Sequence, residues 1–240
     1  MADIVSVDLG INPASIGLCA ISGREASVPK LDQPSIAALS AFLPHWKDDD
    51  GADAYAQEAA AALATYLVSF APRAIVIDGP QGLARRGRKR RRAESILRTS
   101  GATGPMLKPS CNGFSWPAIA RLGVILFNIL ESKGYARLMQ AAIPEGRCAL
   151  EVFPDACWHS FGLDKEELVG LQDLQVGVPL FWKDNTNTDH HLDAAAGALT
   201  ALAACAGDGV FVGHPFFIED GVPREGYIVI PNPGRDWFKK

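Results

Sequence analysis

The stretch Ile4-Val5-Ser6-Val7-Asp8-Leu9-Gly10 decides how the rest of the chain is interpreted. Its apolar residues predict a buried strand, which ends in the carboxylate of Asp8 and then in a glycine. An aspartate at the end of a strand can have a structural role, because it bonds the amides of the following turn. Alternatively, a central strand holds this carboxylate toward a cleft, where it binds a metal ion or orients a phosphate.

The order of the following segments predicts a mixed α/β sheet flanked by helices. Residues 15–21 predict a second strand after a short turn, so the sheet begins with an antiparallel hairpin. The alanine-rich residues 53–70 predict a helix, and the apolar residues 74–80 after it predict a strand parallel to its neighbour. The other predicted elements are helices over 91–99, 116–133 and 190–206, a strand over 147–153, a strand or short helix over 35–42, a small helical excursion over 163–174, and closing or edge strands at 210–212 and 227–230.

Length and composition indicate a soluble globular protein. The chain has 240 residues, of which 48% are hydrophobic and 21% charged, and we predict one domain over residues 1–240 with a basic loop insertion at about 81–115. No apolar run reaches the roughly 18 residues of a membrane span. The N-terminus lacks the features of a signal peptide, and the five cysteines show no paired spacing. We therefore expect a cytoplasmic protein with reduced cysteines and no membrane contact.

A strongly basic segment interrupts a chain whose net charge is −4. Concentrated positive charge indicates a local anionic partner. The segment fits a solvated loop, a patch resembling a nuclear-import signal, or a nucleic-acid clamp, and we favour contact with the phosphates of DNA or RNA. Lys183, in a polar loop, is either a solvated lysine or a further phosphate contact. The basic residues of the segment are Arg85, Arg86, Arg88, Lys89, Arg90, Arg91 and Arg92.

Four carboxylates lie in predicted elements of the core. Asp8, Asp78 and Glu151 lie in or at the end of apolar strands, and Asp193 lies near the start of the late helix. Taken alone, Asp78 fits turn chemistry, Glu151 the solvent face of an edge strand, and Asp193 a favourable position in the helix dipole. Together they favour a bound cation, because a carboxylate in an apolar strand is costly unless it is paired or binds an ion. Oxygen ligands favour Mg²⁺ or Mn²⁺, so we predict all four as metal ligands and catalytic residues.

The order of these motifs resembles the ribonuclease H-like nuclease fold. More narrowly, the chain is similar to a predicted-nuclease family catalogued as domain of unknown function 429. This resemblance spans most of residues 4 to 206 and implies a metal-dependent nuclease, although the basic segment before Glu94 is heavier than expected of that family. The motifs are Val-Asp-Leu-Gly (7–10), Ile-Asp-Gly-Pro-Gln-Gly-Leu (77–83), Arg-Ala-Glu-Ser-Ile-Leu-Arg (92–98), Glu-Val-Phe-Pro (151–154) and Leu-Asp-Ala-Ala-Ala (192–196).

These features predict hydrolysis of nucleic-acid phosphodiester bonds by a two-metal mechanism. His190 and His191 either move protons, contact a phosphate, or are exposed residues near a helix end. Two other functions stay open. One is a kinase or ATPase with an actin-like fold, which also opens with Asp-x-Gly on a hairpin, although we find no second glycine-rich phosphate loop. The other is a non-catalytic nucleic-acid-binding protein on a nuclease-like core, against which the retention of four carboxylates argues.

Overall fold

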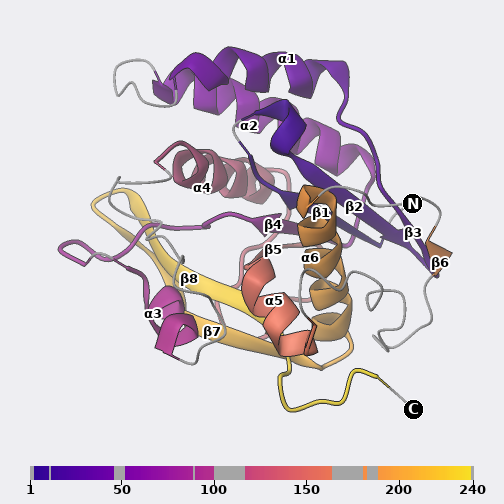
Figure 1. Cartoon of the computed structure of the whole chain (residues 1–240). Coiled ribbons are helices and arrows are strands. Elements are labelled where there is room, and N and C mark those ends of the chain that lie inside the picture. The colour runs from indigo at the N-terminus through magenta and orange to yellow at the C-terminus, as the bar shows by residue number, and fades with distance from the viewer. Residues whose placement is uncertain are drawn as a thin grey trace.

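A single mixed sheet forms the centre of the molecule. The computed structural model describes residues 3–10, 12–45, 52–88, 90–99, 117–163, 181–182 and 189–238. Within these ranges, eight strands pair in the order β6-β3-β2-β1-β4-β5-β8-β7 (Figure 1). The strands are β1 (Ile4–Asp8), β2 (Gly17–Ser22), β3 (Glu25–Ser27), β4 (Ala74–Asp78), β5 (Cys148–Val152), β6 (Phe181–Trp182), β7 (Gly209–Glu219) and β8 (Val222–Pro231).

The register of the central strands determines the face on which each carboxylate lies. β2 is antiparallel to β1, β4 is parallel to β1, and β5 is parallel to β4. Asp8 pairs with Asp78, and Asp78 pairs with Val152, whereas Glu151 pairs with Ile77. Side chains alternate between the two faces along a strand. Asp8 and Asp78 therefore point to one face of the sheet, and Glu151 points to the other.

Helices cover both faces (Figure 1). The face that carries Val7 and Ile77 packs against α1 (Gln33–Phe42), α2 (Ala52–Ser69) and α4 (Pro117–Ser132). The face that carries Val76 and Val152 packs against α5 (Pro154–Phe161) and α6 (Asp189–Cys205). A further helix, α3 (Arg92–Thr99), packs against β7 and β8.

Small residues bring α6 very close to the sheet. The buried positions of this helix are mainly alanines. At Gly17 of β2, a Cβ atom would lie 1.8 Å from the carbonyl oxygen of His190, so only glycine fits there. Gly17 pairs with Asp8 across the β1–β2 hairpin. The first turn of α6 is therefore held against the end of β1, where Asp8 lies.

The mixed sheet predicted from the sequence is confirmed, including the antiparallel hairpin at its start. Residues 35–42 are helical rather than extended, because they continue α1, whose N-terminus is capped by the Asp32 side chain at 3.0 Å from the Ser35 amide. Pro154 ends β5 as expected and also begins α5, since proline suits the first position of a helix.

The C-terminal hairpin is longer than the two apolar runs indicate. β7 and β8 have 11 and 10 residues and are joined by a tight turn at Asp220 and Gly221. Most of the predicted excursion at 163–174, and the part of the basic insertion from residue 100 onward, lie outside the described residues. None of the described helices is long and apolar enough to cross a membrane.

Candidate active site

Two aspartates meet at the ends of neighbouring parallel strands. Asp8 ends β1 and Asp78 ends β4, and their carboxyl groups lie within hydrogen-bonding reach of each other. Burial raises the pKa of Asp8 to about 6; the charge of Asp193 also raises it, while His190 lowers it. Burial, and next the charge of Asp8, raise the pKa of Asp78 well above its ordinary value. The two carboxyl groups therefore share a site that disfavours two negative charges.

The two helices on this face add further carboxylates to the same site. Asp193, near the start of α6, and Asp155, in the first turn of α5, are both close enough to raise the pKa of Asp78. The buried indole of Trp158 donates its Nε1–H to Asp193 Oδ1 at 3.0 Å. This hydrogen bond restricts the rotation of the Asp193 carboxylate.

His190 contacts Asp8 directly. Its Nδ1 lies 2.7 Å from Asp8 Oδ2, and 43% of its side chain is exposed. The approach of α6 to Gly17 brings the imidazole to this position. His191 does not line the pocket described below, and burial lowers its pKa. Of the two neighbouring histidines, His190 is therefore the one that belongs to the site.

Glu151 is held in a different environment from the aspartates. It is buried on a central strand, which excludes the alternative that it lies on the solvent face of an edge strand. Arg91 donates from Nη1 to Glu151 Oε2 at 2.7 Å and from Nη2 to Oε1, and the Gln81 amide donates to Oε2 at 3.0 Å. Arg91 Nε also donates to Glu94 Oε1 at 3.0 Å. Both oxygens of Glu151 are thus engaged by protein donors.

The basic segment is not uniformly exposed, because Arg91, which the sequence predicts as a phosphate contact, is buried. This residue is 2% exposed, and although burial alone lowers its pKa, the charges of Glu151 and Glu94 raise it on balance. Arg85 Nε lies 3.3 Å from Glu225 Oε1, and Arg86 Nη1 lies 3.5 Å from Asp220 Oδ2. Acidic residues of the β7–β8 hairpin therefore offset part of the positive charge of this segment. The side chains of Arg88 and Arg92 are exposed, Arg90 is half-buried, and Lys89 and Lys183 lie outside the described residues.

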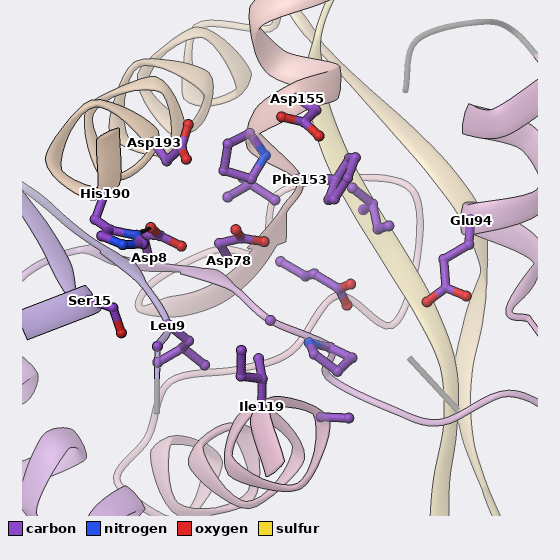
Figure 2. A pocket seen from close by; sticks show the side chains of 18 of the residues that line it. Asp8, Leu9, Ser15, Asp78, Glu94, Ile119, Phe153, Asp155, His190 and Asp193 are labelled. Carbon is purple, nitrogen blue, oxygen red and sulfur yellow. Dashed lines mark hydrogen bonds and ion pairs between the residues drawn. The ribbon is translucent and has the colours of Figure 1, made fainter. Parts of the chain in front are cut away.

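One cavity of about 560 Å³ joins these groups at the carboxyl ends of β1, β4 and β5. Figure 2 shows Asp8, Asp78, Asp193 and His190 gathered on one side of it and Glu94 at the far end. Among the described residues that line the cavity, Arg91 is the one arginine or lysine, and it is paired with glutamates.

The aspartate end suits a hard cation by the chemistry of its donors. Carboxylate oxygens are the ligands that Mg²⁺ and Mn²⁺ prefer, and a bound cation would offset the burial and the neighbouring negative charges that raise the pKa of Asp8 and Asp78. Within the described residues, however, no group of three or more His, Cys, Asp or Glu side chains is already arranged as a metal site. Cation binding would therefore require these side chains to move.

Comparison with known proteins gives a limited result. No family model and no curated protein matches the sequence, so membership of the family catalogued as domain of unknown function 429 is not shown. A structure of Thermus thermophilus RuvC is similar, with 18% identity, a TM-score of 0.41, and coverage of 88% of this chain and 98% of that one. A structure of T. thermophilus RuvC in complex with a Holliday junction substrate is similar at 17% identity and a TM-score of 0.40, covering 85% and 96%.

The strand order and directions of the chain itself are those of a ribonuclease H-like fold. β3, β2 and β1 form an antiparallel meander, and β4 and β5 follow in parallel to β1. Of the four predicted site carboxylates, the structure brings Asp8, Asp78 and Asp193 together and separates Glu151 from them by its pairing with Arg91. Asp155 is the residue that sequence reasoning missed. Its signal is the Pro154-Asp155 pair directly after a central strand, which is typical of the first turn of a helix.

Proposed function

We propose that the protein is a metal-dependent nuclease that hydrolyses nucleic-acid phosphodiester bonds. The observation that carries the proposal is the convergence of the Asp8, Asp78 and Asp193 carboxyl groups on one cavity. Carboxylates placed in this way destabilise the fold unless they serve a bound cation. The ribonuclease H-like fold is compatible with this chemistry, although a fold does not by itself imply a function.

In this proposal, Asp8, Asp78 and Asp193 hold Mg²⁺ or Mn²⁺. Such ions lower the pKa of bound water and compensate charge at the leaving oxygen. Trp158 orients Asp193, and His190 orients Asp8 while its half-exposed imidazole remains accessible for proton transfer. Glu151 belongs to the same cavity but would have to leave Arg91 before it could bind an ion. Glu151, predicted as a metal ligand and catalytic residue, is therefore proposed here as a positioning residue that supports the site through Arg91.

Nucleic acid, either DNA or RNA, is the proposed partner. The exposed side chains of Arg86, Arg88 and Arg92 are the described candidates for phosphate contacts. Arg85 pairs with Glu225, and Arg91 is buried, so we expect smaller contributions to phosphate binding from both. Lys89, Arg90 and Lys183 stay predicted contacts.

The test measures cation binding and cleavage on the same proteins. At a Mn²⁺ concentration 100-fold above its dissociation constant, the free energy of unfolding of the wild type should rise by about 2.7 kcal/mol. Asp78→Asn should abolish this gain and the Mn²⁺-dependent cleavage of DNA, RNA or hybrid strands. Asp220→Asn, at an exposed hairpin turn, is the matched control and should retain both. A wild type that neither gains stability nor cleaves any of these substrates would refute the proposal.

A further inference from the structure

The cavity has an apolar half that the proposed hydrolysis does not explain. Leu9 and Ile119 line it on one side of Asp78, and Phe153 lines it on another (Figure 2). Pro80 also lines the cavity. These residues come from four separate parts of the chain: the turn after β1, the turn after β4, the start of α4, and the junction between β5 and α5. The fold therefore places an apolar wall directly beside the aspartates.

We propose that this apolar half binds one unpaired nucleobase, next to the phosphodiester that is cleaved at Asp8 and Asp78. The proposal rests on the nuclease function and names its substrate class. The preferred substrates are single-stranded or locally unpaired nucleic acids, and intact duplexes are poor substrates.

Size is the first argument. A cavity of about 560 Å³ falls in the range of roughly 300–1,000 Å³ that is typical of pockets for small molecules. A single nucleotide has the size of such a molecule, whereas a base that remains stacked inside a duplex cannot enter. An unpaired nucleotide avoids the free energy that is needed to remove a base from a duplex stack.

Charge is the second argument. The aspartates repel a polyanion except through a bound cation, so the site needs another source of affinity for its substrate. The basic segment contributes less to substrate affinity than its charge suggests, because Glu225, Asp220 and Glu94 pair with Arg85, Arg86 and Arg91. A nucleobase offers apolar faces that stack on aromatic rings independently of sequence. The partly exposed ring of Phe153 lines the cavity for such a contact.

The first experiment compares two ligands that carry the same phosphates. A single-stranded trinucleotide and the same trinucleotide with an abasic sugar in the middle are titrated into the wild-type protein in Ca²⁺, with binding followed by fluorescence anisotropy. If the pocket holds the central base, its removal should weaken binding about 5-fold or more. In Mn²⁺, the single strand should be cleaved at least about 5-fold faster than a duplex of the same sequence.

Variants then locate the base. Ile119→Trp fills the cavity and should abolish the difference in binding affinity between the intact and the abasic trinucleotide. Ile125→Trp makes the same change on α4 at a residue that packs with the core rather than lining the cavity, and should preserve the difference. If Ile119→Trp fails to fold, Phe153→Leu provides a milder change, with Phe211→Leu on β7 as its control.

The outcomes separate this inference from the proposed function. Equal binding of the two trinucleotides, with cleavage still lost in Asp78→Asn, would overturn the base pocket and leave the nuclease proposal intact. An unchanged preference in a folded Ile119→Trp would likewise overturn the pocket. The absence of both binding and cleavage in the wild type would overturn both proposals.

Discussion

The two ends of the cavity hold carboxylates in opposite ways. At one end, Glu151 and Glu94 surround the guanidinium of Arg91, so two buried negative charges share a buried cation. At the other end, Asp8 and Asp78 face each other at the ends of adjacent strands. A carboxylate with a built-in partner stabilises its surroundings, whereas a carboxylate that faces another keeps its need for a cation. Under the proposed function, the first end has a structural task and the second a chemical one.

Loss of Arg91 should have the largest effect. Arg91→Ala would leave Glu151 and Glu94 buried without their cation, and we expect the free energy of unfolding to fall by about 3–5 kcal/mol. The control is Arg86→Ala, which removes an exposed arginine paired with Asp220 and should cost at most about 1 kcal/mol. Chemical denaturation measures both changes. Equal effects of the two substitutions would show that the buried triad has no special role.

The pH dependence of stability should identify the aspartate end. The pKa of Asp8 is about 6 in the folded protein, against an ordinary value of 3.8, so the folded state retains a proton that the unfolded state loses first. In EDTA, stability should therefore fall as pH rises from about 4 to 6, by roughly 3 kcal/mol from Asp8 alone. Asp8→Asn should remove this component of the pH dependence. Urea unfolding at pH 4 and pH 7 measures this component. An equal change in the free energy of unfolding between the two pH values in the wild type and in Asp8→Asn would contradict the assignment.

Neutralising one carboxylate at each end should give effects of opposite sign. Glu151→Gln removes the partner of Arg91 and should lower the free energy of unfolding by about 1–3 kcal/mol. Asp78→Asn relieves repulsion with Asp8 and should leave stability unchanged or raise it. Thermal denaturation without divalent ions compares the two. Destabilisation of the same size in both variants would remove the distinction between the ends.

Substitution of Trp158 should have the smallest effect on the free energy of unfolding and a larger effect on the affinity for the cation. Trp158→Phe keeps an aromatic ring but removes the donor to Asp193, so stability should fall by only about 1 kcal/mol. Mn²⁺ affinity, measured by electron paramagnetic resonance, should fall about 10-fold because Asp193 is no longer oriented. Trp237→Phe removes a similar hydrogen bond to the Asn232 carbonyl and is the control. Equal Mn²⁺ affinity in both variants would argue against an orienting role.

The sequence predicts the central elements of the fold well because their patterns are local. Val5 and Val7 mark a buried strand, the alanines of residues 53–70 mark a helix, and Asp8 and Asp78 each end an apolar run before a turn. The resulting pairing of Asp8 with Asp78 follows from two parallel strands that end at the same level.

The face of the sheet to which Glu151 points depends on the register of β5 against β4, and local sequence does not determine this register. Moving a strand residue by one position reverses the face to which it points. Glu151 pairs with Ile77 rather than Asp78, and a distant basic segment supplies its partner Arg91. From composition alone, Arg91 would be expected to be exposed like its basic neighbours. Its burial depends on contacts with β5, which is distant in sequence.

Gly17 extends the site to a residue that has no side chain. A methyl group at this position would overlap the His190 carbonyl and displace the start of α6, moving His190 away from Asp8. In a scan of all single substitutions, position 17 should thus tolerate as little change as the aspartates, although it performs no chemistry. Redesign of this protein for another substrate therefore has to leave unaltered a contact that a search for reactive groups would overlook.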